Sequence, residues 1–192
     1  MYKLLKYDIL ILMKYILLFL FSGTCYAGGN FTFDYNFLTH HFSKNGASRY
    51  ENKVSGDGRT INNPIYGLTF ASDDRHGWSS FTLFSGKDSI DSELNGFVYS
   101  SGFGKAKGTT LQLGWYLGSY LYDQDAWDNH YPNNEIITPS WVDYYFGLGG
   151  INVLAGITLN LQIEISPGII IRFNNYINPA LTNHTFSFGF TY

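Results

Sequence analysis

The stretch Phe186-Ser187-Phe188-Gly189-Phe190-Thr191-Tyr192, at the end of the chain, decides the fold class. Aromatic residues hold every even position, and small or polar residues hold the odd positions. Because successive side chains of a β-strand point to opposite faces, all four rings lie on one face. The closing strand of an outer-membrane β-barrel has this pattern, since its outer face meets lipid and its inner face the lumen. The alternative is an edge strand of a soluble sandwich, where an open aromatic stripe has little purpose.

The first 27 residues have the features of a secretory signal. Lysines precede apolar residues, Met13-Lys14 precedes a second apolar run, and small residues lead to Ala27. We predict a signal peptide over 1–27, cleaved after Ala27, with Met13 as an alternative start. A membrane anchor is the rival interpretation, but charged residues shorten the apolar stretch below the ~20 residues that a spanning helix needs.

The remaining residues, 28–192, are predicted to form one domain. Residues 1–27 contain three lysines, one aspartate and the only cysteine, Cys25. Of the 12 basic and 15 acidic residues of the chain, nine and fourteen therefore lie in 28–192, a net charge near −5. A domain without cysteine has no thiol, disulfide or Cys-metal site. Its acidic balance does not suggest a nucleic-acid partner.

Composition favours an all-β membrane barrel over a helical membrane protein. The chain is 45% hydrophobic and 19% aromatic, yet its mean hydropathy is only −0.10. No segment of 28–192 reaches the ~18 continuous apolar residues of a membrane helix. Alternating strands of a barrel produce this combination, because each strand averages to neutral hydropathy. We therefore expect an eight-stranded antiparallel transmembrane β-barrel of the bacterial outer membrane.

Eight strands can be assigned from the alternation. They are expected near residues 30–42, 65–71, 78–85, 94–103, 109–122, 142–148, 153–165 and 186–192. The longer connections are expected at 43–63, 86–93, 123–141 and 174–183, and the short ones at 72–77, 104–108 and 149–150. Such barrels have short periplasmic turns and longer outer loops, so the long connections are placed at the external rim. Eight strands enclose a narrow interior, which disfavours a porin.

Polar residues at the expected external rim form a candidate catalytic site. His40 and His41 end the first strand, and Lys87-Asp88-Ser89 lies in the second outer loop. A histidine, a carboxylate and a hydroxyl could converge there, as acyl transfer with general base catalysis requires. Regular alternation would turn only one of the two histidines inward. It favours His40, on the same face as Asp34.

Several short runs resemble the lipid A palmitoyltransferase family, PagP. They are Thr39-His40-His41, Arg49-Tyr50-Glu51-Asn52, Asn63-Pro64, Tyr66-Gly67-Leu68, His76-Gly77 and Lys87-Asp88-Ser89. The resemblance implies an outer-membrane enzyme that moves a palmitoyl chain from a phospholipid to lipid A. It favours His41 as acid or base, with His40 as the alternative. Asp88 would orient the histidine, and Ser89 would be nucleophile or transition-state donor.

Two further features fit the same resemblance. Ser166-Pro167-Gly168 looks like the family's Pro-Gly break, which opens the barrel wall for lipid entry, and proline does interrupt ladder bonding. Gly96, Gly114 and Gly118 are expected to face the lumen, where they could leave room for an acyl chain or simply relieve crowding. The family's amphipathic N-terminal helix is missing, because Gly28-Gly29-Asn30 leads directly into the first strand.

Two other functions stay open. One is a non-catalytic barrel for envelope integrity or adhesion. The other is a lipid A deacylase, which should carry an adjacent His-Ser pair near its last strands, whereas this chain has His184 and Ser187 there. We expect no cofactor or metal, and interpret the acidic residues of 123–130 as a solvated loop. Expected partners are phospholipid, lipopolysaccharide and, during biogenesis, the barrel assembly machinery that reads C-terminal strands. We expect a monomer.

Overall fold

The computed structural model describes residues 28–42, 60–73, 77–88, 91–123, 125–126, 129, 151–179 and 181–192. The strands are β1 (Gly29–His41), β2 (Thr60–Ile61), β3 (Ile65–Asp73), β4 (Trp78–Lys87), β5 (Glu93–Phe103), β6 (Thr110–Tyr122), β7 (Ile151–Ser166), β8 (Ile169–Ile177) and β9 (Leu181–Thr191). Among the described residues, no helix is long and apolar enough to cross a membrane.

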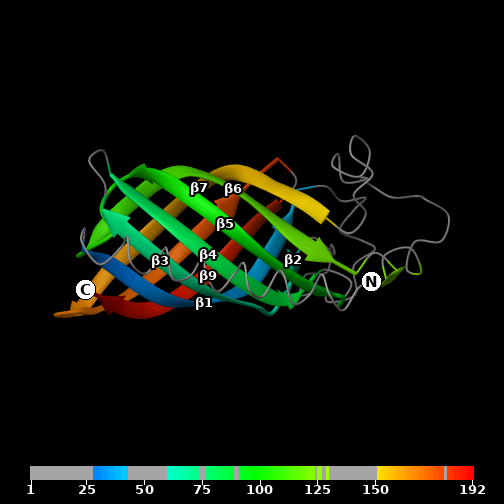
Figure 1. The fold of residues 1–192 in the computed structure, drawn as a ribbon, viewed down its shortest axis with the longest axis horizontal. Helices are drawn as coiled ribbons and strands as arrows, with labels where there is room; N and C mark the ends of the chain where they lie inside the picture. Colours follow the sequence, from blue (N-terminus) through cyan, green and yellow to red (C-terminus); the bar gives the residue numbers. More distant parts are fainter. Residues whose placement is uncertain are drawn as a thin grey trace, which may run out of the picture.

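The strands form one closed antiparallel barrel (Figure 1). Each strand from β3 to β9 pairs with the next, and β1 pairs with β3 on one side and β9 on the other. The two-residue β2 continues the line of β3 beside the end of β1, where Thr39 pairs with Ile61. Eight full strands therefore close the ring, as the alternation predicts. Closure pairs the first strand with the last, so none of the eight full strands is an open edge strand, which is what a membrane requires of a sheet.

The structure corrects one strand of the sequence-based assignment. The predicted strand at 142–148 and turn at 149–150 lie outside the described residues, and β6 pairs directly with β7, with no strand between them. The eighth strand is instead β8, Ile169–Ile177. Sequence reasoning missed it because Ile169-Ile170-Ile171 does not alternate. The expected long connection at 174–183 is also wrong, since β8 runs to Ile177 and β9 starts at Leu181.

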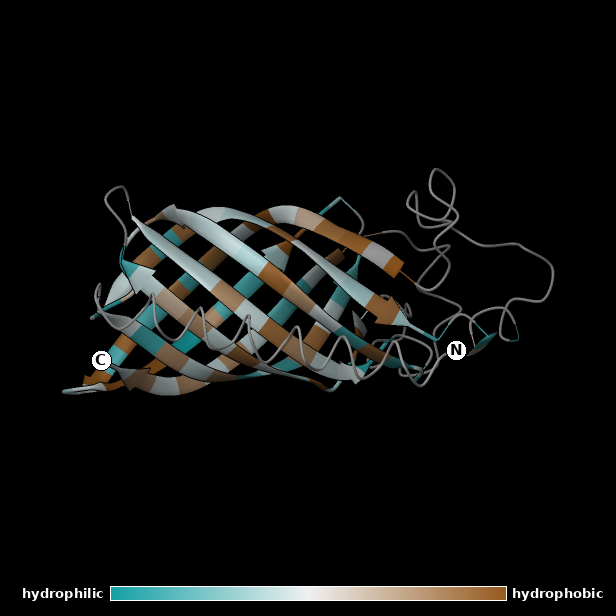
Figure 2. Cartoon of the chain, in the orientation of Figure 1, coloured by the Kyte–Doolittle hydropathy of each residue, from teal (hydrophilic) through white to brown (hydrophobic). Residues whose placement is uncertain are grey.

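The barrel wall is apolar outside and polar inside. Figure 2 shows brown and teal residues alternating along the strands. The exposed large side chains include Phe33, Tyr99, Leu113, Trp115, Ile157, Leu161, Phe173, Phe186, Phe188 and Phe190. Their neighbours on the opposite face are polar and buried: Asn30, Thr32, Asp34, Thr69, Ser100, Gln112, Thr158, Asn160, Gln162, Arg172, Asn174 and Ser187. This inverts the polarity of a soluble protein and is the arrangement of a transmembrane barrel.

The two ends of the barrel differ. The connections 74–77, 104–109 and 167–168 are short and lie at the same end as Gly28 and Tyr192. At the other end β1 stops at His41 and β6 stops at Tyr122, and the next full strands, β3 and β7, begin only at Ile65 and Ile151. Short turns mark the periplasmic end of outer-membrane barrels. The chain therefore resides in the bacterial outer membrane, with this end toward the periplasm. The signal peptide over 1–27 lies outside the described residues and stays a prediction, as does the domain boundary at 28.

The β5–β6 turn closes the periplasmic mouth. Ala106, at its centre, has no exposed surface and packs with Ala71 and Trp78. Its N–H donates to Asp73, and Gln162 Nε2 donates to its carbonyl at 2.9 Å. The turn is thus tucked inside the wall, held by side chains that point into the lumen.

Candidate functional site

A β-bulge decides which histidine of the predicted site faces the lumen. In the β1–β9 ladder, the register shifts between Asn36 and Leu38. The extra residue, Phe37, reverses the alternation, because a bulge sets two residues against one. Asn36 is buried before the bulge, and beyond it the buried positions are Thr39 and His41.

His41 therefore points inward, as the resemblance favoured, and the alternation argument for His40 was wrong. His41 is 8% exposed at the outer end of β1. His40 lies on the other face of the strand, with its Nδ1 3.0 Å from the Thr60 hydroxyl. Its ring also contacts Phe42 at 6.0 Å between centroids. The sequence carries no mark of this bulge.

Polar side chains line the lumen just below His41. Asn36 Nδ2 donates to the Asn63 carbonyl at 3.0 Å, and Thr39 Oγ1 donates to Asn183 Oδ1 at 2.6 Å. These bonds join β1 to the segment before β3 and to β9. Hydrogen-bonded polar side chains therefore line the lumen beside β1, just below His41.

Asp88 lies at the same rim, at the end of β4, and is 6% exposed. Its Oδ1 accepts a hydrogen bond from the Ser92 N–H at 2.9 Å, and its own N–H donates to the Ser92 carbonyl at 2.8 Å. Asp91 within this turn has a φ of 64°, a left-handed conformation that aspartate tolerates. Asp88 thus stabilises the β4–β5 turn. Ser89 lies outside the described residues, so the convergence of His41, Asp88 and Ser89 stays a prediction.

The glycines expected to make room for an acyl chain face the lumen, but neighbouring groups occupy their space. A Cβ at Gly96 would lie 2.5 Å from Phe84 Cζ and 2.7 Å from Tyr120 Cβ. A Cβ at Gly118 would lie 2.9 Å from Val98 Cγ2, and one at Gly114 would meet the backbone of β5. The crowding interpretation of these glycines fits the structure better than the acyl-chain interpretation.

The predicted Pro-Gly break in the wall is not a break. Pro167-Gly168 forms the two-residue turn between β7 and β8, and Gly168 has the positive φ of 81° that such a turn needs. The two strands pair from Ser166 and Ile169 onward, with one bulge between Glu164 and Ser166. Pro167 therefore lies at a hairpin end, where it disrupts no ladder bond.

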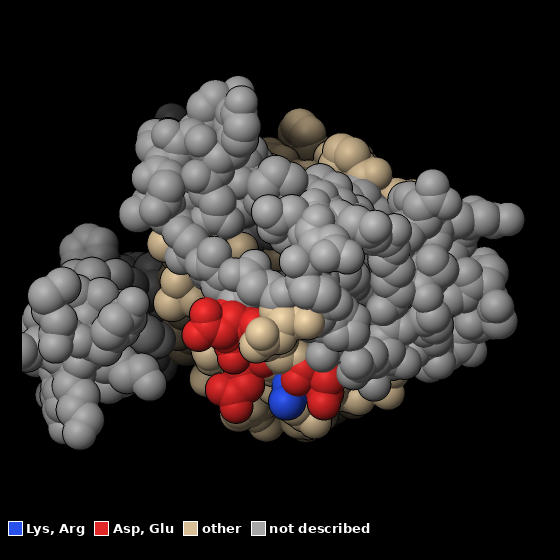
Figure 3. All heavy atoms as spheres, turned by 90° about the vertical axis from the view of Figure 1, so that its right-hand side faces the viewer, with Lys and Arg blue, Asp and Glu red and all other residues tan. Residues whose placement is uncertain are grey.

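The outer rim is acidic where it is described. Figure 3 looks onto this end and shows carboxylates grouped on one side. The exposed acidic residues there are Asp91, Glu93, Asp123 and Asp125. Lys87 Nζ lies 4.0 Å from Asp91 Oδ1, and Asp123 Oδ1 accepts from the Ala126 N–H at 3.1 Å. The described residues contain no group of three or more acidic, histidine or cysteine side chains that could hold a metal ion.

Sequence reasoning did not single out a charged pair inside the barrel. Asp34 on β1 and Arg172 on β8 are both buried in the lumen, with Arg172 Nη2 4.0 Å from Asp34 Oδ1. The available signal was the alternation of Ile170, Arg172 and Asn174 against Ile171 and Phe173, which makes this arginine inward-facing once 169–177 is assigned as a strand.

Comparisons with known proteins give matches among solved structures alone. No family model matches the chain, and no curated protein matches it. A solved structure of Ail, the attachment invasion locus protein of Yersinia pestis, has 11% identity and a TM-score of 0.36 to this chain, covering 85% of it and 99% of Ail. Ail in complex with the heparin analogue sucrose octasulfate has 12% identity and a TM-score of 0.34, with the same coverage. These values do not allow residues to be matched between the chains.

Proposed function

We propose that this chain is a non-catalytic outer-membrane barrel that serves envelope integrity or surface adhesion through its external end. The observation that carries the proposal is the filled lumen. The inward residues of the periplasmic half are buried and hydrogen-bonded to one another, and Ala106 closes the mouth below them. A lumen packed in this way offers neither a solute nor a lipid tail a passage through its periplasmic half.

The external end of the barrel is then the part that can carry the function. The small barrel supplies a rigid base, and function in such scaffolds is placed on the loops that it carries. The described part of the rim carries exposed carboxylates, which belong in solvent rather than in lipid. Expected partners are the surrounding phospholipid and lipopolysaccharide, and the assembly machinery during biogenesis, with the chain as a monomer.

A lipid A acyltransferase is the second candidate, because the bulge at Phe37 places His41 inward at the rim that also holds Asp88. Against it stand the polar, packed periplasmic half of the lumen and the bond from Ser92 that Asp88 already accepts. A deacylase is less well supported still. His184 bonds Asn175 at 2.7 Å on the outer face of β9, whereas Ser187 faces the lumen, so the two cannot form a catalytic pair.

Mass spectrometry of lipid A separates these candidates. Cells that overexpress the wild-type chain should yield unchanged lipid A if the barrel is non-catalytic. One added acyl chain would instead support the transferase, and one lost chain the deacylase. Should acylation occur, Ser89→Ala and His41→Phe are expected to abolish it while the heat-modifiable gel shift of the folded barrel persists.

A direct test of the non-catalytic function uses the same cells. Deleting the gene should lower resistance to bile salts or reduce attachment to a host-cell layer, and Ser89→Ala should restore either property fully. Failure of the Ser89→Ala variant to complement, with normal barrel levels in the membrane, would contradict the non-catalytic proposal.

A further inference from the structure

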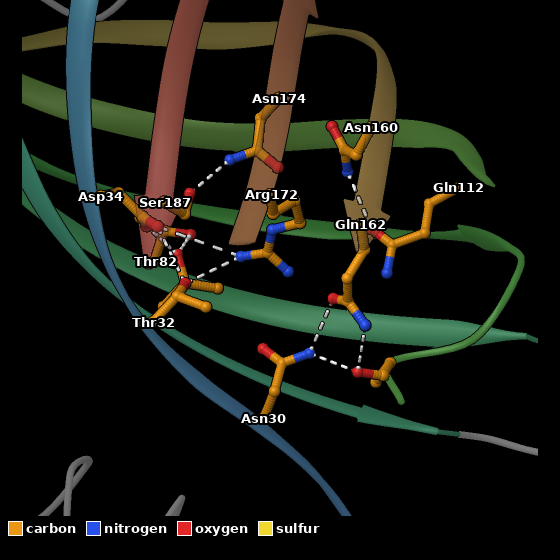
Figure 4. A network of polar contacts seen from close by, with 12 residues as sticks. Asn30, Thr32, Asp34, Thr82, Gln112, Asn160, Gln162, Arg172, Asn174 and Ser187 are labelled. Carbon is orange, nitrogen blue, oxygen red and sulfur yellow. Dashed lines mark hydrogen bonds and ion pairs between the residues drawn. The ribbon is translucent and has the colours of Figure 1, made fainter. Parts of the chain in front are cut away.

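Arg172 reaches across a whole strand inside the barrel. It belongs to β8, yet its Nη2 donates to Thr32 Oγ1 of β1 at 2.9 Å and lies 4.0 Å from Asp34 Oδ1 of the same strand (Figure 4). The strand between them is β9, since the order is β8-β9-β1. The guanidinium therefore joins two strands that share no ladder.

Small residues on β9 make this reach possible. The β9 residue paired with both Arg172 and Asp34 is Ser187, and the one paired with Thr32 is Gly189. A Cβ at position 189 would lie 2.7 Å from Thr32 Cγ2. The inward face of β9 thus carries only small residues where Arg172 passes over it, while its outward face carries the aromatic side chains.

The carboxylate that receives Arg172 is held from several strands. Thr32 Oγ1 donates to Asp34 Oδ1 at 2.8 Å, and the Thr69 hydroxyl on β3 donates to Asp34 Oδ2. Thr69 Oγ1 lies 2.6 Å from Thr82 Oγ1 on β4. Arg172 is 2% exposed, so the ion pair lies in a low-dielectric interior. Removing one partner there leaves the other charge buried and unpaired.

The contacts of Arg172 with Thr32 and Asp34 lie where the first and last strands of the barrel meet. The strands from β3 to β9 pair in chain order, so each of those ladders joins segments closer in sequence than β1 and β9. The β1–β9 ladder joins the first strand to the last, and closing so long a loop carries the largest entropy cost. A contact that bridges β8, β9 and β1 strengthens the ladder that is hardest to form.

We infer that Arg172 is a clasp that closes the barrel: by passing over Ser187 and Gly189 to Thr32 and Asp34, it locks β9 between β8 and β1. The clasp is formed only when the ring is closed, because an open sheet leaves β1 and β8 at a distance. It gives the interior charge pair a role in assembly and seam stability that does not depend on whether the chain is an enzyme.

Hydrogen exchange measured strand by strand tests the clasp. The purified barrel in detergent micelles is labelled with deuterium, and exchange is compared among peptides of β1, β9, β5 and β6. Arg172→Met should speed exchange in β1 and β9 by roughly a hundredfold, the loss expected when a buried pair is broken, and leave β5 and β6 nearly unchanged. The matched control is Asn160→Leu, which removes a buried bond to Gln112 at 3.1 Å between β7 and β6, away from the seam.

A second pair of variants keeps both charges and carries the test even if Arg172→Met does not fold. Ser187→Leu obstructs the path of Arg172 over β9, whereas Ser187→Ala only removes a bond from Asn174 at 2.8 Å. Faster exchange in β1 and β9 is expected for Ser187→Leu and not for Ser187→Ala. Exchange that rises equally in all strands, or that rises equally in both Ser187 variants, would overturn the clasp.

Discussion

At the scale of single residues, one extra side chain in β1 sets the orientation of the whole outer end of that strand. Phe37 shifts the register between Asn36 and Leu38, so His41 points inward and His40 outward. A regular strand would have reversed them, because the side-chain period is two. The candidate site therefore depends on a residue that takes no part in its chemistry.

Removing Phe37 should make the strand regular and leave His41 inward. With Phe37 deleted, Leu38 follows Asn36 directly and takes the outward position, so position 41 keeps the inward phase and position 40 the outward phase. Single cysteines at positions 40 and 41 can be labelled with a fluorophore, and brominated lipid then quenches the outward-facing label. We expect quenching at position 40 in the parent barrel and in the deletion variant. Quenching that moves to position 41 after the deletion would show that Phe37 is not the extra residue of the strand.

At the scale of elements, the β5–β6 turn is part of the interior. Its backbone accepts from inward side chains on two strands: Gln112 Nε2 donates to the Lys105 carbonyl at 2.7 Å, and Gln162 Nε2 donates to the Gly108 carbonyl at 2.9 Å. The sequence predicted a short turn at 104–108, but not that the turn lies inside the periplasmic mouth of the barrel. Ala106 fits there because a methyl group fills the space between Ala71 and Trp78.

A large residue at position 106 should expel the turn. Ala106→Arg would overpack a site without free volume, which costs about 1–3 kcal/mol of folding free energy. The substitution would also bury the charged guanidinium group inside the periplasmic mouth. We expect a lower urea midpoint in the gel-shift assay and easier proteolysis at 104–109. Lys105→Ala, on an exposed neighbour, is the control, and equal effects of the two variants would argue against a tucked turn.

At the scale of the whole molecule, a band of outward apolar side chains suits the barrel to a membrane. Outward apolar residues around the ring are exposed in the isolated chain and would lie in hydrocarbon in a membrane. A charge in that band is costly near the bilayer centre and cheap near its edge. Ile157, 53% exposed, lies near the middle of β7, whereas Phe103, 74% exposed, ends β5 at the periplasmic rim.

These two positions give a depth-dependent prediction. Ile157→Arg should lower the free energy of unfolding in lipid vesicles by about 2–4 kcal/mol, and Phe103→Arg by about 0–1 kcal/mol. Urea titration followed by tryptophan fluorescence measures both values. A soluble barrel would tolerate both substitutions equally, so similar costs would contradict the membrane assignment.

The sequence by itself determined the class of fold, the positions of seven of the eight strands and the face on which most side chains lie. It could do so because alternation is a local property, visible in a few consecutive residues such as Phe186 to Tyr192. It failed at β8, where Ile169-Ile170-Ile171 hides the period and Pro167 suggested a break rather than a hairpin turn.

Only the tertiary structure decided the phase of His40 and His41, the occupancy of the space at Gly96 and Gly118, and the reach of Arg172 over β9. Each depends on register between strands that are distant in sequence or on the shape of a neighbouring side chain. A bulge changes no local pattern, and a glycine looks the same whether its space is empty or filled. The histidine phase and the reach of Arg172 exist only once the ring has closed, because both depend on the pairing of β9 with β1.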